Sequence, residues 1–187
     1  GQVPPQDKIS FLQKPFHPHE VRQMAIALHS KWRAERHIAR LAYFDSLTGL
    51  PNRQHTMERL AGAMKHAAGA GGATAVLYID LDNFKRVNDT LGHSSGDEIL
   101  MQCALRLRET VQAQAAAGTS SAGIGDLGRL GGDEFVVILP EAGRREAAAA
   151  MAERVISALS QPIRIGEHEI VMTPSIGIAL SPDHGAD

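Results

Sequence analysis

Hydrophobic positions recur with a helical spacing in the first long stretch of the chain. After Pro18 this spacing predicts one continuous helix that runs to about Phe44. Its apolar residues near a 3.5-residue spacing are Val21, Met24, Leu28, Ile38 and Ala42. Lys31 and Glu35 occupy the middle positions of that seam. Two interpretations stay open: a signalling stalk or short coiled coil, and a plain amphipathic helix that lies on its own domain.

From Asp45 onward, segments with the hydrophobic spacing of helices alternate with segments that have the pattern of strands. The further predicted helices cover residues 52–68, 84–91, 96–117 and 146–159. The predicted strands cover residues 73–79, 129–130, 135–139, 163–165 and 169–180. Asn52 is a natural N-cap for the first of these helices, and Gly92 stops the second.

The order of these elements indicates an α+β fold. The two apolar runs on either side of Gly131-Gly132-Asp133-Glu134 are typical of a β-hairpin. Other strands are separated by helices and need crossover connections. We therefore expect a sheet with helices packed on it.

Composition and charge narrow the class of protein. The 187 residues include 19 Lys+Arg and 21 Asp+Glu, and the formal net charge of −2 offers no global attraction to nucleic acid or to an acidic membrane. Cys103 is the single cysteine, so a disulfide framework and a Cys-rich zinc site are excluded. It lies on the apolar face of the helix predicted at 96–117, where we expect core packing. No apolar run reaches a membrane span, so we expect a cytoplasmic domain.

Acidic residues stand at two predicted strand ends. Asp80 and Asp82 close the first strand, and Asp133 and Glu134 occupy the hairpin turn. If the two strands are neighbours, Asp80 and Asp133 could share a divalent cation near a polyphosphate, because Mg²⁺ takes one or two carboxylates together with phosphate oxygens. Solvated turn carboxylates are the alternative interpretation.

A second polar set surrounds the stop at Gly92. Asn88 and Asp97 are residue types that can read a guanine edge, because the carboxylate accepts from N1–H and the exocyclic amine while the amide offers a donor and an acceptor. His93 lies between them in the sequence. Asn88 and Asp97 are also residues that cap helices or favour a first helical turn, and this alternative stays open.

Four segments carry a resemblance to a known family. In chain order they are 45–53 (DSLTGLPNR), 80–97 (DLDNFKRVNDTLGHSSGD), 129–139 (RLGGDEFVVIL) and 175–179 (SIGIA). In wording, order and spacing they resemble the GGDEF family of diguanylate cyclases. The resemblance divides the chain into a lead-in at 1–18, a helical linker or stalk at 19–44 and a GGDEF domain at 45–187.

The resemblance implies a palm-like fold with a central, mostly antiparallel sheet, related to adenylyl cyclase and polymerase catalytic domains. It implies the condensation of two GTP molecules into cyclic di-GMP by a homodimer, in which each protomer holds one GTP. The 3′-hydroxyl of each GTP attacks the α-phosphate of the other. The implied cofactor is Mg²⁺, with Mn²⁺ as an alternative.

The same resemblance assigns roles by position. Asp80, the carbonyl of Leu81 and Asp133 would hold the metal. Asp133 would also accept the proton, with Glu134 beside it in the signature.

The substrate-binding residues follow from the same resemblance. Asn88 and Asp97 would read guanine, while His93 and the glycines Gly131 and Gly132 would contact the substrate. Lys85 would stabilise the charge that develops on the phosphates.

Two departures from the family pattern are visible. Residues 121–126 lack the arginine of the family's RxxD product-inhibition motif, so we expect no feedback through it. The family continues past a strand such as 175–180 into a helix that supplies Lys and Arg to the triphosphate, whereas this chain stops at Asp187. We therefore expect a domain that continues in the parent protein.

The flanks suggest partner domains. Residues 11–16 (FLQKPF) resemble the closing Lys-Pro motif of a response-regulator receiver, which would make 1–18 a receiver remnant. Residues 89–97 resemble GGDEF domains fused to EAL phosphodiesterases. Two other functions therefore stay open: a catalytically silent GTP-binding module that regulates an attached domain, and a dimerising signal relay through 18–44.

Overall fold

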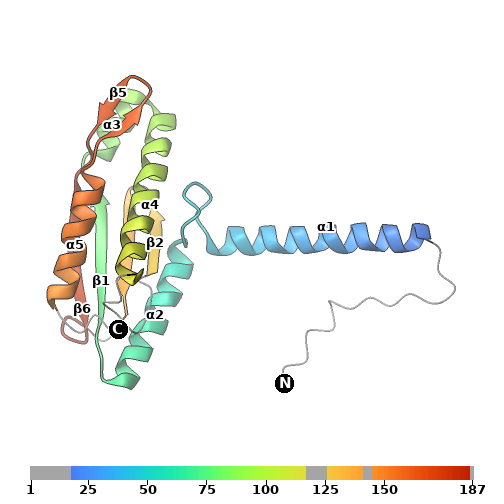
Figure 1. The fold of residues 1–187 in the computed structure, drawn as a ribbon, viewed down its shortest axis with the longest axis horizontal. Coiled ribbons are helices and arrows are strands. Elements are labelled where there is room, and N and C mark those ends of the chain that lie inside the picture. Colours follow the sequence, from blue (N-terminus) through green and yellow to red (C-terminus); the bar gives the residue numbers. More distant parts are fainter. Residues whose placement is uncertain (1–17, 117–125, 141–144, 186–187) are drawn as a thin grey trace. The chain divides into compact units, whose positions relative to one another are not determined.

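The computed structural model describes residues 18–116, 126–140 and 145–185 (Figure 1). The chain divides into two compact units, Gly1–Ala42 and Tyr43–Asp187. Helix α1 (Pro18–Tyr43) accounts for the described part of the first unit. The elements of the second unit are α2 (Arg53–Ala70), β1 (Thr74–Leu81), α3 (Phe84–Leu91), α4 (His93–Ala116), β2 (Asp126–Gly131), β3 (Glu134–Leu139), α5 (Arg145–Leu159), β4 (Ile163–Ile165), β5 (His168–Ile170) and β6 (Pro174–Ser181).

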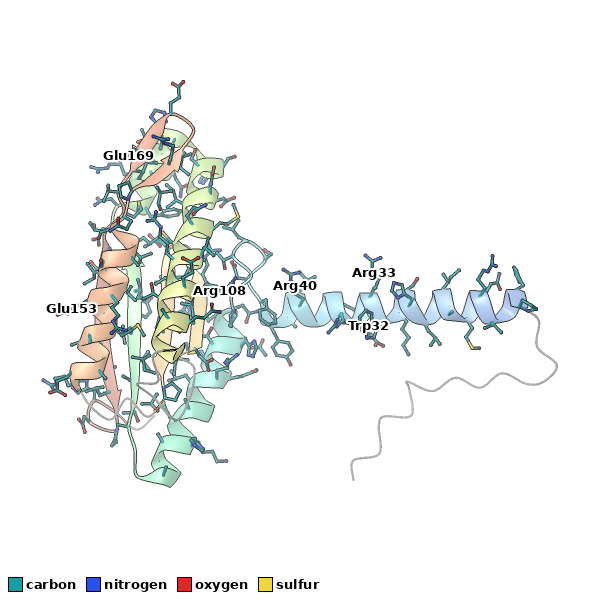
Figure 2. All side chains as sticks on the ribbon, viewed as in Figure 1. Trp32, Arg33, Arg40, Arg108, Glu153 and Glu169 are labelled. Atoms are coloured by element: carbon teal, nitrogen blue, oxygen red, sulfur yellow. The ribbon has the colours of Figure 1, made fainter. Side chains whose placement is uncertain are left out.

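Helix α1 carries several large apolar side chains that are exposed. They are Val21, Ile26, Leu28, Trp32, Ile38 and Leu41. Figure 2 shows Trp32, Arg33 and Arg40 projecting from this helix. The guanidinium carbon of Arg36 lies 4.5 Å from the centre of the Trp32 ring, a cation–π contact that covers part of the indole. The coiled coil stays a prediction for this helix.

The second unit is built on a four-stranded sheet of order β2-β3-β1-β6, in which neighbouring strands are antiparallel. Strand β1 is central, so its C-terminal end at Asp80 and Leu81 is flanked by β3 on one side and by the start of β6 on the other. Strands β4 and β5 form a separate two-stranded hairpin.

The two faces of the sheet are covered differently. Leu77 on β1 and Phe135 on β3 belong to a buried core that includes Leu107 of α4 and Val155 of α5, so α4 and α5 cover that face. Helix α2 packs against β2 and β3, and its Thr56 lies on Gly128, which shares the opposite face with Val136 and Tyr78. Beyond α2 that second face is open, since Tyr78 on β1 is 41% exposed. Because side chains alternate along a strand, Asp80 shares the open face with Tyr78.

Most predicted elements are confirmed, including the N-cap at Asn52, whose side chain accepts from the amide of His55 at 3.0 Å. The helix predicted to start at residue 96 begins already at His93, so Asp97 is not in its first turn. The single strand predicted over 169–180 is wrong, because β5 ends at Ile170 in the hairpin with β4 and β6 begins only at Pro174.

The α+β prediction with a mostly antiparallel sheet is confirmed. Cys103 is buried, and burial raises the pKa of its thiol to about 12, as expected for core packing and not for a nucleophile. In the described ranges no helix has the length and hydropathy to span a membrane. The lead-in, except Pro18, and residues 121–125 of the inhibition-motif region lie outside the described residues.

One glycine lets α2 approach the sheet closely. A Cβ on Gly128 of β2 would come within 2.9 Å of the Cβ of Thr56 and would overlap its hydroxyl. Thr56 is buried, and that hydroxyl donates to the carbonyl of Asn52 at 2.7 Å, so the side chain has little freedom to move away. In contrast, a Cβ on Gly62 of the same helix would meet no atom within 4 Å.

Replacing Gly128 with alanine therefore lowers the free energy of unfolding, by about 1–3 kcal/mol as for other overpacked sites. The matched control Gly62→Ala is expected to raise it by up to about 1 kcal/mol, because alanine is the better helix former. Urea denaturation of both variants measures the difference. Equal effects of the two substitutions contradict the close approach.

Candidate active site

The end of β1 holds two acidic residues opposite each other. Asp80 on β1 pairs with Glu134 on β3 in the antiparallel register. The amide of Leu81 donates to the carbonyl of Asp133 at 3.3 Å, so Leu81 and Asp133 form a hydrogen-bonded pair. Asp80 and Glu134 are then the adjacent non-hydrogen-bonded pair, in which Cα atoms lie about 4.5 Å apart and side chains share a face. The backbone pairing thus holds two carboxylates side by side.

Asp133 occupies the two-residue turn between β2 and β3. Gly131 and Gly132 have φ angles of +141° and +53°, which residues with a side chain rarely adopt. A Cβ on either glycine would meet no atom within 4 Å, so the outer side of the turn is open. Backbone conformation, more than crowding, explains the two glycines.

The carbonyl of Leu81 faces the same turn. In an extended strand the N–H and C=O of one residue point to the same side, and the Leu81 N–H points to Asp133. The Leu81 carbonyl therefore lies close to Asp133, whose negative charge acts on Asp80.

The acidic residues at the end of β1 repel one another. Partial burial raises the pKa of Asp80, and the negative charges of Asp133 and Glu134 raise it further. Glu134 also raises the pKa of the Tyr78 hydroxyl through a hydrogen bond. Because the folded state raises the pKa of Asp80, ionisation of this group opposes folding, and stability decreases as the pH rises through that pKa.

Asp82 belongs to a different contact. Its two carboxylate oxygens accept from the hydroxyls of Thr173 and Ser175, each at 2.7 Å, and its amide donates to the Thr173 carbonyl at 2.8 Å. The hydroxyl contacts lower the pKa of Asp82, so its contribution to stability is lost as the pH falls through that lowered pKa. Asp82 thus joins the end of β1 to the start of β6 and is not among the open carboxylates.

The turn at 43–53 contributes residues to which the sequence analysis gave no role. Asp45 Oδ1 accepts from the Thr48 amide at 2.8 Å and from Arg129 Nη1 at 2.9 Å. Burial raises the pKa of Asp45, but the Thr48 and Arg129 contacts outweigh it, so the pKa lies below its usual value. Ionised Asp45 stabilises the fold until the pH falls through that lowered pKa. The only sequence signal for the contact between Asp45 and Arg129 was that both residues belong to the family motifs at 45–53 and 129–139.

The predicted guanine-reading residues Asn88 and Asp97 lie on α3 and α4, which pack together. A Cβ on Gly96 of α4 would come within 2.9 Å of Asn88 Cγ on α3, so the Asn88 side chain lies directly on Gly96. Asp97 follows in the chain and is exposed. Exposed Lys85 lies in the first turn of α3, and His93 is the first residue of α4.

The donors at the end of β1 suit a hard cation. Within residues 18–116, 126–140 and 145–185, no three or more His, Cys, Asp or Glu side chains form a group that could hold a metal. Two carboxylates and a carbonyl at an open surface nevertheless leave positions for water and phosphate, which is how Mg²⁺ binds in nucleotide sites. The raised pKa of Asp80 agrees, because a cation would offset the repulsion among the acids.

Comparison with known proteins assigns the family. A family model for "Diguanylate cyclase, GGDEF domain" matches residues 42–187. The solved GGDEF domain of TpbB (YfiN) from Pseudomonas aeruginosa superimposes with a TM-score of 0.68 at 36% identity, covering 77% of this chain and 78% of that one. The chain therefore belongs to the GGDEF family of diguanylate cyclases, which are nucleotidyltransferases.

Two curated relatives show the range of activities named within this family. The bifunctional diguanylate cyclase/cyclic di-GMP phosphodiesterase MucR of Pseudomonas aeruginosa is 43% identical over 153 residues. The cyclic di-GMP phosphodiesterase PdeR of Escherichia coli is 39% identical over 155 residues. These matches cover 82% and 83% of this chain but only 21% and 22% of the relatives, so the chain spans about a fifth of their length.

The acid repulsion predicts that a divalent cation stabilises the fold. At pH 7, Mn²⁺ at about 100-fold its Kd is expected to raise Tm by roughly 5–10 °C. Asp80→Asn is expected to raise Tm in the absence of cation, since it removes one of the repelling charges, and to abolish the Mn²⁺ response. Differential scanning calorimetry with and without Mn²⁺ measures both effects.

Asp82→Asn is the matched control. It weakens the contacts to Thr173 and Ser175, so Tm falls while the Mn²⁺ response remains. If Asp80→Asn keeps the Mn²⁺ response and Asp82→Asn loses it, the assignment of the cation site to Asp80 is wrong.

Proposed function

We propose that this chain condenses two GTP molecules into cyclic di-GMP, with release of two pyrophosphates, across a dimer in which each protomer binds one GTP. The observation that supports this most is the strand pairing that sets Asp80 opposite Glu134, with Asp133 in the adjoining turn. A cytoplasmic location, where GTP is abundant, is part of the proposal.

The acidic residues hold the cation and accept the proton. Asp80, the Leu81 carbonyl and Asp133 would bind Mg²⁺, or Mn²⁺ in its place, which neutralises phosphate charge and makes the attacked phosphorus more electrophilic. Asp133 takes the proton of the 3′-hydroxyl as that oxygen bonds to the α-phosphorus of the opposite GTP. Glu134 lies beside Asp133, and its negative charge favours binding of the cation.

The substrate contacts come from the turn and from the two helices that follow β1. Lys85 offsets the charge that builds up on the phosphates in the transition state, and open Gly131 and Gly132 let them approach the backbone. Asn88 and Asp97 hydrogen-bond the guanine, and His93 contacts the nucleotide nearby. Because the partner protomer brings the second GTP, orientation of the two half-sites governs the rate.

Turnover is the direct test. With GTP and Mg²⁺ the chain is expected to yield cyclic di-GMP and pyrophosphate, followed by chromatography. Asp133→Ala is expected to lower kcat by about 10²–10⁴-fold, as for loss of a general base, while Tm in the absence of cation does not fall, because the substitution removes one of the repelling charges. The control Asp89→Ala removes an exposed acid of α3 that lies outside the acid cluster, and it keeps wild-type turnover. Absence of product from a dimeric sample contradicts the proposal.

Guanine reading is tested through Gly96. Gly96→Ala displaces the Asn88 amide, so KM for GTP is expected to rise about 10-fold, the value of one lost hydrogen bond, and discrimination against ATP is expected to weaken. Gly62→Ala is the matched helical control, because open space surrounds that glycine. Unchanged KM and discrimination in Gly96→Ala would remove Asn88 from the base-reading role.

A second candidate function is a GTP-binding module without turnover. It is favoured by the similarity to PdeR, which carries the name of a phosphodiesterase. In this case GTP binds with micromolar affinity in calorimetry, no product forms, and an attached EAL phosphodiesterase domain responds to GTP.

The alternative of a relay through α1 predicts instead that removal of residues 18–42 changes the oligomeric state. Upstream receiver and downstream EAL domains remain proposals for the parent protein.

A further inference from the structure

Arg129 contacts the catalytic turn and the 43–53 turn at the same time. Its Nε and Nη2 both donate to the Gly132 carbonyl, at 3.1 and 2.7 Å, while Nη1 donates to Asp45. Its own amide donates to the Pro51 carbonyl at 2.9 Å. The side chains of Arg129 and Asp45 are only 10% and 21% exposed, so solvent competes little for these bonds.

Asp45 is itself held in place. Its amide donates to the Leu50 carbonyl at 2.8 Å, and its carboxylate accepts from the hydroxyl and the amide of Thr48. The guanidinium is thus anchored on a closed turn, and a planar guanidinium can bridge two acceptors with a fixed geometry.

The catalytic turn is held at Asp133 by the bond from the Leu81 amide, but its two glycines leave the backbone before Asp133 with more conformational freedom. It contains Gly131 and Gly132, both at positive φ with open space around them, and a β-bulge lies between Arg129 and Gly131. The Gly132 carbonyl is restrained by the pair of bonds from the Arg129 side chain, which comes from the preceding strand β2 and is itself held by Asp45.

We propose that Arg129, anchored by Asp45, positions Asp133 for the reaction by fixing the Gly132 carbonyl; this inference rests on the proposed function. We call Asp45, Thr48, Arg129 and the Gly132 carbonyl the Arg129 clamp. Arg129 is a positioning residue, because it acts on the reaction only through the turn.

The geometry of the peptide group explains how the clamp reaches Asp133. The Gly132 carbonyl and the Asp133 amide belong to one planar trans peptide, in which C=O and N–H point in opposite directions. When Arg129 holds the carbonyl, the Asp133 amide and Cα are fixed as well. The range of positions open to the Asp133 carboxylate is then limited to the side-chain rotamers.

The test compares Arg129→Lys with Arg59→Lys in the full chain. Arg59 also forms an ion pair with an aspartate of β2, through Nε to Asp126 Oδ2 at 2.7 Å, but it does not touch the catalytic turn. A lysine at 129 cannot reach Asp45 and Gly132 with the same fork. We expect kcat to fall roughly 100-fold, the cost of misplacing a reacting group by about 1 Å, with KM for GTP nearly unchanged. Arg59→Lys keeps both constants.

Backbone ¹⁵N relaxation supplies a readout that does not depend on turnover. In Arg129→Lys the order parameters of Gly132 and Asp133 are expected to fall from about 0.85 to below about 0.6, while those of β3 and of Arg59→Lys stay at the wild-type level. Asp45→Asn, which preserves shape and the Thr48 contacts, is expected to give an intermediate loss in both measurements.

The outcomes separate the two proposals. If wild-type protein makes no product but the turn loosens in Arg129→Lys, the proposed function fails and the positional restraint by the clamp stands. If wild-type protein is active and Arg129→Lys keeps kcat, or loses kcat with an ordered turn, the clamp is overturned.

Discussion

The antiparallel pairing of β1 with β3 is the constraint on which the site depends. Its register leaves Asp80 and Glu134 on one face in a non-hydrogen-bonded pair and sets Asp133 across from Leu81. Like charges directly opposite each other in a sheet are destabilising. Partial burial and that repulsion raise the pKa of Asp80, and a bound cation would relieve the repulsion.

Acidic residues close to this pair have a different role, because they form structural contacts and are not left open for a ligand. Asp82 lies two positions after Asp80, yet it is occupied by Thr173 and Ser175 and secures the start of β6. Near the turn, Asp45 anchors Arg129, and Arg129 in turn restrains the glycine-containing turn. Asp45 and Asp82 thus stabilise the fold, whereas Asp80 and Asp133 repel each other. Substitutions within these two pairs are therefore expected to have opposite effects on stability.

Much of the fold could be predicted from local patterns. The helix at 84–91 ending at Gly92, the buried strand before Asp80 and the hairpin around Gly131–Glu134 all depend on residues near in sequence. The break between β5 and β6 was missed because apolar residues dominate at 170–172 and again at 176–180, and only pairing with β4 shows that the two parts belong to two sheets. The role of Asp82 was equally hidden, since its partners are 91 and 93 positions away.

The convergence of Asp80 and Asp133 on one cation is most directly measured by anomalous diffraction from Mn²⁺ in crystals grown with a non-hydrolysable GTP analogue. We expect one strong peak within about 2.2 Å of oxygens from Asp80, Asp133 and the Leu81 carbonyl, shared with phosphate oxygens. A peak bound to Asp82, or nucleotide bound with no peak near Asp80, would contradict it.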